Sequence, residues 1–477
     1  METYATFLPL DRRFALASGS DLPDRTNGAA LFADISGFTP LTAVLAQELG
    51  PHRGAEELTR HLNHVFSSLI AQVHLHLGNV IGFSGDAITC WFDESDSGEL
   101  DPATLALACA LQLQQVMAQL EAMRTPQGQA ITLALKVALA AGPVRRFLVG
   151  DPEKYVMETM AGAILDQMAA AEKQTIQGEV VVTADFLESL PVRPVVSTWR
   201  RDDYGQRFAV ISSMPIAVSP AQRPPVPPIP AAVARQWLLP PVFDRLQQGA
   251  DDFLADLRPT TVLFLRFGGI DYDGDDNAGK KLDAFVRHTQ AILDHYEGFL
   301  IQLTVGDKGS YFYITFGAPI AHENDPVRAA AAALELRDLP AKFPFLQPLH
   351  MGISQGLAHS SAYGNPERRC YGVMGNEVNI SARLMTTAEP GQILLAPTAA
   401  EMVRSTFSLT ALPPVRLKGI REPLPVWELG ERLFAMRTAV WRSAMPMVGR
   451  NLERQQLEKA LDRLLNGRSN ILIIEGQ

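Results

Sequence analysis

The sequence predicts an α/β protein with two copies of one α/β sandwich domain, in which helices cover a β-sheet. Two observations support this prediction. An internal repeat runs in the same order through both halves of the chain, and short β-branched or aromatic runs alternate with Ala- and Leu-rich helical stretches in each half. The length of 477 residues exceeds what one hydrophobic core normally serves, which also indicates several domains.

The repeat consists of four pairs of matching segments. LFADISGF at Leu31 matches LFLRFGGI at Leu263, and IGFSGDAITCWF at Ile81 matches TVGDKGSYFYITF at Thr304. Farther along, LKVALAAG matches LHMGISQG and GDPE matches GNPE, so that the separations run from about 214 to 232 residues. Helical stretches such as PATLALACALQLQQVMAQL and DPVRAAAAALELRDL lie between the strands. Four matches in one order favour a duplicated domain.

The remaining segments complete the predicted domain plan. Residues 219–230 contain six prolines, a composition typical of an extended connector. The tail ends in an apolar strand followed by Gly476, which suggests the start of a P-loop ATPase domain of a longer protein. The predicted parts are an N-terminal extension (1–26), a first domain (27–212), a linker (213–257), a second domain (258–430) and the tail (431–477).

Composition restricts the classes of function. The chain has 42 basic and 52 acidic residues and no dense run of Lys and Arg, so a nucleic-acid partner is not expected. Its three cysteines lie far apart without a CxxC pair, which favours core thiols in a reducing compartment over zinc or disulfides. Because no leader and no apolar run of roughly 18 residues occurs, we expect a soluble, cytoplasmic protein without a membrane span.

Two aspartates in the first copy suggest a metal site. Asp34 ends an apolar run, and Asp86 lies in a predicted hairpin that leads into a strand. If the two strands are neighbours, both carboxylates meet at one end of a sheet, next to the backbone carbonyl of Ile35. Such a set of oxygens suits Mg²⁺ or Mn²⁺ that also holds substrate phosphates. The alternative is ordinary, with Asp34 as a helix N-cap and Asp86 as a turn former.

The turn after the first aspartate suggests phosphate binding. Ser36 and Gly37 break the apolar run just before a predicted helix. The backbone amides of Ser36, Gly37 and Phe38 can then face phosphate oxygens at the helix start.

The second copy lacks both acids. Arg266 stands at the place of Asp34, and Ser310 stands at the place of Asp86. The second copy therefore cannot hold the metals in the same way.

A different polar set occurs in the second copy. The segment YGVMGNEVNISARLM carries Asn379 and Arg383, four residues apart and so on one helical face, and VGDKGSYF carries Lys308 on a strand-end turn. Residues 151–187 of the first copy contain neither Asn nor Arg. Two copies packed head to tail about a pseudo-twofold axis would thus form one complete site and one degenerate site at their interface.

The chain resembles a class III nucleotidyl cyclase with both catalytic domains in tandem. The resemblance spans about residues 27–430 and rests on FADISGFT, FSGDA, VMGNEVNISARLM and LKGIREPLPVWEL. It is strongest to the soluble adenylyl cyclase type, in which the cyclase pair precedes a P-loop ATPase region. It implies ferredoxin-like βαββαβ domains, two Mg²⁺ or Mn²⁺ ions, and conversion of ATP to cyclic AMP and pyrophosphate through in-line attack of the ribose 3′-hydroxyl on the α-phosphorus.

The resemblance also implies roles for individual residues. Asp34, Asp86 and the Ile35 carbonyl match the metal ligands of the family. Asn379 matches the residue that orients the ribose, and Arg383 matches the residue that stabilises the transition state.

Further positions concern the base and the triphosphate. Lys308 matches a lysine that reads adenine, while Lys136 and Lys418 fit residues that hold the triphosphate but could equally be ordinary exposed strand lysines. Adenylyl cyclases place an Asp or Thr at the position of Gly372, eleven residues before the transition-state arginine. Base selection is therefore expected from Lys308, from a backbone group such as that of Val373, or from a water.

Regulation by bicarbonate is not expected to follow the familiar pattern. Mammalian soluble-type enzymes bind this anion through a Lys shortly before the second metal aspartate and an Arg in the first-copy helix. Gly82 stands at that Lys position, and residues 151–187 contain no Arg. We therefore expect weak or absent activation by bicarbonate.

Several functions stay open at this point. Beside an adenylyl cyclase regulated by an ATPase region in the same protein, the alternatives are a guanylyl cyclase, a nucleotide-binding module without turnover, and an interaction scaffold that uses the fold alone. Because both halves of the site lie in one chain, a monomer is expected to suffice.

Overall fold

The computed structural model describes residues 3–433 with short gaps. The gaps are 99, 121–122, 126, 129, 222, 250–254, 307–308 and 418–421, and beyond residue 433 only 456, 459, 460 and 463 are described. Residues Met1–Glu431 form one compact unit, and Arg432–Gln477 belong to a second. The predicted P-loop start around Gly476 lies outside the described residues.

The first half of the chain folds around an eight-stranded sheet. The strands along its path are β2 (Asn79–Ser84), β3 (Ala87–Asp93), β1 (Arg25–Ser36), β6 (Ala134–Asp151), β8 (Val180–Thr183), β10 (Arg207–Ser213) and β9 (Val195–Arg201), and β7 (Tyr155–Ala161) pairs with β6. The order β2-β3-β1-β6 is antiparallel throughout. With one helix after β1 and one after β3, this is the ferredoxin-like βαββαβ arrangement.

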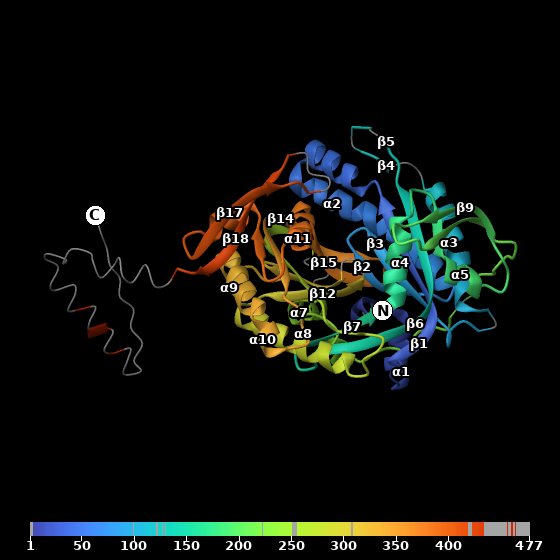
Figure 1. Ribbon diagram of the computed structural model, residues 1–477, viewed down its shortest axis with the longest axis horizontal. Helices are drawn as coiled ribbons and strands as arrows, with labels where there is room; N and C mark the ends of the chain where they lie inside the picture. The colour runs from blue at the N-terminus through green and yellow to red at the C-terminus, as the bar shows by residue number, and fades with distance from the viewer. Residues whose placement is uncertain are drawn as a thin grey trace. The chain divides into compact units, whose positions relative to one another are not determined.

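The second half repeats this sheet strand for strand. Its strands are β12 (Phe299–Gly306), β13 (Gly309–Phe316), β11 (Asp256–Phe267), β14 (His350–Gly364), β16 (Ile393–Leu395), β18 (Leu424–Arg432) and β17 (Phe407–Val415), with β15 (Arg369–Met374) paired to β14. A small separate sheet joins β4 (Met123–Arg124) and β5 (Ala130–Ile131). The two large sheets have the same strand order, which confirms the predicted α/β fold class and the duplication (Figure 1).

Helices cover both faces of each sheet. The helices are η1 (Thr3–Phe7), α1 (Leu10–Ser18), α2 (Phe38–Leu75), α3 (Pro102–Gln119), α4 (Ala163–Lys173), α5 (Ala184–Ser189), α6 (Ala231–Arg235), α7 (Pro240–Gln247), α8 (Ala278–His295), α9 (Asp325–Arg337), α10 (Leu339–Lys342), α11 (Asn376–Thr387) and α12 (Pro397–Val403). In the first half α2 and α3 pack on the face of Leu31 and Ala33, and α4 packs on the face of Ala30. Because side chains alternate along a strand, Asp34 faces the α4 side.

Each half sends a two-stranded arm into the other half. The β6–β7 arm buries Phe147, Val149 and Tyr155 in the core that α8 forms with the second sheet. In return, Tyr363 of the β14–β15 arm is buried in the core of the first half. This exchange of equivalent arms is the head-to-tail packing that the sequence predicted. In Figure 1 the labels β2, β12 and β15 lie together between the two sets of helices.

The proline-rich connector lacks helix and strand among its described residues, as its composition predicted. It is nevertheless packed against the first half. The Arg223 guanidinium donates to Asn79 Oδ1 at 2.6 Å and to the Leu77 carbonyl at 2.5 Å. Ile229 is buried in a small cluster with Ala5 and Ala234. The connector therefore packs against the first half of the chain and is not a free linker.

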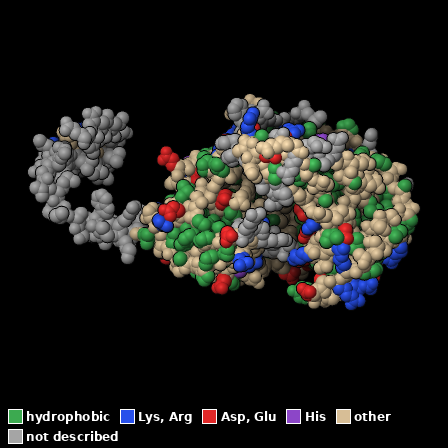
Figure 2. Space-filling view, turned by 90° about the horizontal axis from the view of Figure 1, so that it is seen from above, with side chains coloured by type: hydrophobic (Ala, Val, Ile, Leu, Met, Phe, Trp, Pro, Cys, Tyr) green, Lys and Arg blue, Asp and Glu red, His purple; other side chains and the backbone are tan. Residues whose placement is uncertain are grey.

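Within the described part of the chain, no helix has the length and apolarity needed to cross a bilayer. On the face drawn in Figure 2, acidic and basic side chains are both scattered among hydrophobic and uncharged ones.

Candidate active site

The structure brings Asp34 and Asp86 together at one end of the first sheet. Asp34 is paired with Ala87 in the β1–β3 ladder, and the next residue, Ile35, donates its amide to the carbonyl of Asp86 at 3.2 Å. Asp86 lies in the two-residue turn of the β2–β3 hairpin, beside Gly85 in the left-handed region at φ 66°. Burial, with a further contribution from the charge of Asp34, raises the pKa of Asp86 to about 6.

This pair of acids fits a divalent cation. Two neighbouring carboxylates gain from a positive charge between them, and carboxylate oxygens are ligands that Mg²⁺ and Mn²⁺ accept. Among the described residues no cluster of three or more His, Cys, Asp or Glu side chains is arranged to hold a metal. A cation here would therefore rely on Asp34, Asp86 and a backbone oxygen such as that of Ile35.

The turn after Asp34 leads directly into the first residues of α2. Gly37 is the N-cap at φ 105°, and no side chain among the described residues forms a capping hydrogen bond there. A Cβ at this position would lie 3.0 Å from the Leu133 side chain and 3.1 Å from the Thr132 carbonyl, so the turn requires glycine. Free amides at a helix start favour an anion. Ser36 ends β1 beside this turn, and the backbone of Phe38 begins the helix.

Lys136 lies directly across the ladder from Asp34, on the same face of the sheet. Its side chain is half-buried, and its ammonium group is 3.8 Å from a carboxylate oxygen of Glu172 on α4. The structure thus places Lys136 beside the acids rather than on an open surface. Glu172 could not be recognised from the sequence, because its contact depends on how α4 packs on the sheet.

Asn379 and Arg383 lie one turn apart on α11 of the second half. The buried side chains of Ser381 and Met385 fix the opposite side of this helix. Arg383 is half-buried, burial lowers the pKa of its guanidinium, and no described residue gives this group a hydrogen bond or an ion pair. Asn379 is exposed. An unpaired, partly buried guanidinium is available for a phosphate or phosphoryl oxygen.

Strand β2, which leads into the Asp86 hairpin, lies against the arm that leads into α11. The Arg368 guanidinium donates to the carbonyls of Val80 and Ile81 on β2 at 2.8 and 2.9 Å. Met374, two residues before α11, packs against the hydrophobic core of the first half. The helix that carries Asn379 and Arg383 therefore begins close to the first domain, as Figure 1 shows for α11, β15 and β2.

Gly372 and Val373 lie on β15. A Cβ at Gly372 would come within 3.3 Å of the Tyr363 ring, which is itself almost fully buried. The Val373 carbonyl accepts a hydrogen bond from the Tyr313 hydroxyl at 2.8 Å. The space next to Gly372 is thus partly occupied by an aromatic ring.

Two of the lysines expected to contact a nucleotide, Lys308 and Lys418, lie outside the described residues.

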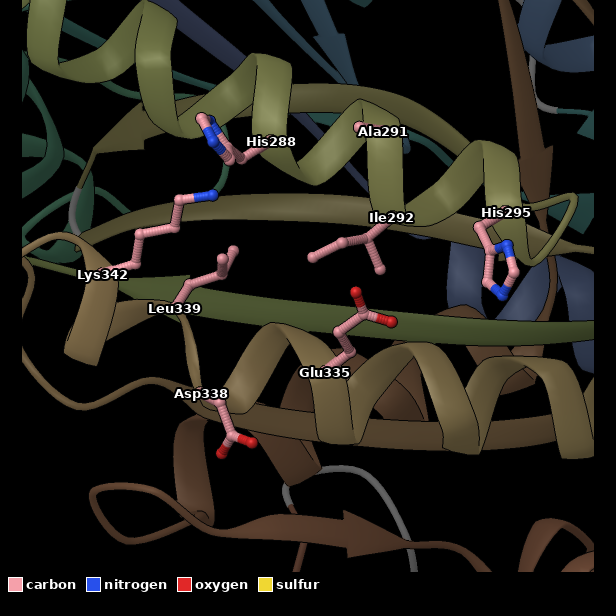
Figure 3. A pocket seen from close by; sticks show the side chains of 8 residues that line it. All are labelled: His288, Ala291, Ile292, His295, Glu335, Asp338, Leu339 and Lys342. Carbon is pink, nitrogen blue, oxygen red and sulfur yellow. The ribbon is translucent and has the colours of Figure 1, made fainter.

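A pocket of about 390 Å³ lies elsewhere, between α8, α9 and α10 (Figure 3). Figure 3 shows Lys342 reaching toward His288 and Glu335 pointing into the gap, whereas Asp338 points away. Every residue that lines it belongs to the second half, and none is a predicted site residue. It is therefore separate from the candidate active site.

Comparison with known proteins agrees with this arrangement. Residues 278–430 match the family described as the adenylate and guanylate cyclase catalytic domain. A class III adenylyl cyclase-like ATP-binding protein from Pseudomonas aeruginosa has the same fold, with 12% identity, a TM-score of 0.56 and coverage of 82% of this chain and 93% of that one. This chain carries two class III nucleotidyl cyclase-like domains.

Curated relatives extend the likeness over most of the chain. Adenylate cyclase type 10 from Rattus norvegicus is 23% identical over 487 residues, which cover 94% of this chain and 30% of the relative. The Homo sapiens protein of the same name is 22% identical over 494 residues, with 95% and 30% covered. The chain thus spans about 30% of the length of these relatives.

In the second cyclase-like domain the place of the acids is filled by other side chains. Arg266 pairs with Tyr311 as Asp34 pairs with Ala87, so that Ser310, the residue before Tyr311, corresponds to Asp86, the residue before Ala87. The Arg266 guanidinium lies 2.9 Å from Nδ1 of His350, and the Ser310 hydroxyl is hydrogen-bonded to the Tyr272 hydroxyl at 2.7 Å. Tyr272 could not be recognised from the sequence, because it lies in a loop outside the matching segments of the repeat.

Proposed function

We propose that this chain is an adenylyl cyclase that converts ATP to cyclic AMP and pyrophosphate at one composite site. The observation that carries the proposal is the close approach of Asp34, near the end of β1, to Asp86, in the turn of a hairpin whose strand β2 packs against the second cyclase-like domain. The guanidinium of Arg383 on α11, which has no partner among the described residues, supplies a second, independent support. The names of the curated relatives favour ATP as the substrate.

The first domain would bind the phosphates. Asp34, Asp86 and the Ile35 carbonyl would hold two Mg²⁺ or Mn²⁺ ions. Such ions, when bound, lower the pKa of the ribose 3′-hydroxyl and neutralise phosphate charge. The amides around Gly37 at the start of α2 bind phosphate oxygens, and Lys136 adds a positive charge next to the acids.

The second domain would orient the sugar and stabilise the transition state. Asn379 holds the ribose so that its 3′-oxygen faces the α-phosphorus in line with the leaving pyrophosphate. The 3′-oxygen loses its proton and bonds to phosphorus while the bond to pyrophosphate breaks. Arg383 presents a planar fork to the oxygens on which charge develops.

Selection of the base and regulation belong to the same proposal. Lys308 and the backbone of Gly372 and Val373 read adenine, and Lys418 contacts the triphosphate. Since the relatives are much longer than this chain, a regulatory ATPase region in the same protein is proposed as well. We also propose a cytoplasmic location, function as a monomer, and little activation by bicarbonate.

A second candidate is a nucleotide-binding module without turnover. Gly372 favours this candidate, because the position lacks the side chain that would select adenine. Such a module would keep metal-dependent ATP binding but form no cyclic product. A guanylyl cyclase is the remaining variant of the same chemistry.

The test is formation of cyclic nucleotide from ATP and, separately, from GTP, with Mn²⁺ or Mg²⁺ and with product identified by chromatography. We expect cyclic AMP from ATP, and a loss of roughly 10³-fold in kcat for Arg383→Ala, by analogy with arginines that stabilise phosphoryl transfer. Arg404→Ala is the matched control, since Arg404 is exposed and paired only locally with Glu401. Retained Mn²⁺–ATP binding with no cyclic product from either nucleotide would leave the second candidate in place.

A further inference from the structure

Arg368 is a buried arginine without an acidic partner. Its side chain is 4% exposed, and no described carboxylate forms an ion pair with it. Its guanidinium instead donates four hydrogen bonds, of 2.5 to 2.9 Å, and every acceptor is a backbone carbonyl. Burial lowers the pKa of this group to about 10, so it is still charged at neutral pH. Burying a charge costs free energy unless the group is paired or hydrogen-bonded, and here the four hydrogen bonds offset that cost.

The four acceptors belong to three different parts of the molecule. Two are the carbonyls of Val80 and Ile81 on β2 of the first domain. A third is the carbonyl of Phe7 in the N-terminal segment, and the fourth is that of the neighbouring Arg369. The guanidinium also lies over the ring of Phe83, 5.3 Å from its centroid, near the end of β2. One side chain thus joins the second-domain arm, the N-terminal segment and β2.

The contact falls on a bulge in β2. The β2–β3 register shifts between Val80 and Gly82, so Ile81 is an extra residue without a ladder partner. A bulge frees backbone groups and changes the direction of the strand beyond it. Arg368 satisfies the carbonyls at this bulge, and β2 ends three residues later at Ser84, directly before the Asp86 turn.

The equivalent place in the other half provides an internal comparison. Strand β12 has the same bulge, between Leu300 and Gln302. In the repeat, GDPEK of the first half matches GNPER of the second, so Lys154 stands where Arg368 stands. Lys154 pairs instead with Asp294, and the Leu300 carbonyl accepts one hydrogen bond, from the Tyr155 hydroxyl at 3.2 Å. Among the described residues, the buried cation therefore lies beside the β2–β3 hairpin, whereas its counterpart beside the β12–β13 hairpin forms a partly exposed ion pair.

We propose that Arg368 is a positioning residue that holds the Asp86 hairpin in place against the second domain and thereby sets the metal affinity of the site. The inference rests on the proposed function only in assigning a divalent cation to the two aspartates. Lysine keeps the charge, but its three N–H donors are all on one nitrogen, so they cannot reproduce the planar fork of the arginine guanidinium.

The test compares Mn²⁺ binding by the wild-type chain, Arg368→Lys and Arg368→Gln, measured by electron paramagnetic resonance with the non-reactive analogue α,β-methylene-ATP. We expect both variants to bind Mn²⁺ about tenfold or more weakly, the range found for residues that orient metal ligands. In both variants Mg²⁺ should also compete less well with Mn²⁺ for the site, because Mg²⁺ tolerates less distortion of its ligand geometry. Arg369→Gln is the matched control, since it removes the neighbouring guanidinium, which contacts Thr6 and the Phe7 ring. It should stay within about twofold of wild type.

A second measurement separates positioning from a general loss of stability. Hydrogen exchange of the amides of residues 83–88 should accelerate in Arg368→Lys, while amides of β14 exchange as in the wild type. Unchanged Mn²⁺ affinity in Arg368→Lys, or equal acceleration in both places, would overturn the proposal. If the wild type binds Mn²⁺ but makes no cyclic nucleotide, the proposed function fails while this comparison stands. If it binds no Mn²⁺, the metal assignment and this proposal both fail.

Discussion

Asp86 is the residue whose ionisation most affects the candidate site. Its pKa of about 6 lies above the ordinary value of 3.8 because the side chain is buried and faces Asp34. The folded chain therefore holds this proton more tightly than the unfolded chain does. The stabilisation from this proton is complete at acidic pH and is lost as the pH rises through about 6. A bound cation would stabilise the ionised carboxylate and so offset this loss of stability.

Metal binding is predicted to compete with this proton. Below about pH 6 the Mn²⁺ affinity of the wild-type chain should fall by up to tenfold per pH unit, and above pH 7 it should be flat. Titrations with Mn²⁺ at pH 5, 6, 7 and 8 check this prediction. Asp86→Asn should bind Mn²⁺ weakly with a much smaller dependence on pH. Equal wild-type affinity at pH 5 and pH 7 would show that the acids are not ligands.

Individual residues also show what the sequence could and could not provide. The approach of Asp34 and Asp86 could be predicted, because a strand end and a hairpin turn are both visible in local sequence patterns. The contacts of Glu172 and Tyr272 could not, because they depend on how a helix and a loop pack on the sheet. The burial of Arg368 could not be predicted either, since GNPER reads as an ordinary polar turn.

At the scale of elements, α1 and the β6–β7 arm meet through buried charges. Arg146 donates to Asp11 at 2.6 Å and to Glu158 at 2.9 Å, and Arg12 donates to the same glutamate at 3.0 Å. All four side chains are at most 5% exposed. Burial alone would raise the pKa of Glu158, but the two arginines outweigh it and the pKa is lowered. The N-terminal segment is thus fixed to the arm that enters the second domain.

Removing one member of this cluster should be costly. Arg146→Met is expected to lower the free energy of unfolding by about 3 to 5 kcal/mol, because Asp11 and Glu158 would keep buried charges without their main partner. Urea unfolding at pH 7 measures the loss. The control is Arg25→Met, which breaks an exposed ion pair with Asp276 and should cost about 1 kcal/mol or less. Equal losses in the two variants would contradict this account of the cluster.

The exchange of arms shows the limit of sequence patterns for elements. Periodicity and the repeat predicted the strands, the helices around the site and the head-to-tail arrangement. They could not predict that Phe147 is buried in the second domain or that Tyr363 is buried in the first. A hydrophobic residue in a strand indicates burial, but it does not indicate which half of the molecule supplies the partner.

At the scale of the whole molecule, two domains of one fold carry different chemistry. Their sheets have the same strand order, but one sheet end carries Asp34 and Asp86 while the other carries Arg266 and Ser310. The pairing of these positions followed from aligning the repeat, and the ladder registers agree with it. The account predicts a single site that handles metal and nucleotide, built from both halves.

The most direct test of this claim is the rate of cyclic AMP formation from Mn²⁺–ATP by two matched variants, Asp86→Asn and Ser310→Ala. These residues correspond in the two domains, since each directly precedes the strand residue that pairs with Asp34 or with Arg266. The account predicts that Asp86→Asn loses roughly 10²-fold or more in kcat, since a metal ligand is removed, whereas Ser310→Ala stays within about threefold of the wild type. Similar losses in both variants, or full activity in Asp86→Asn, would contradict a single site assembled around the acids of the first domain.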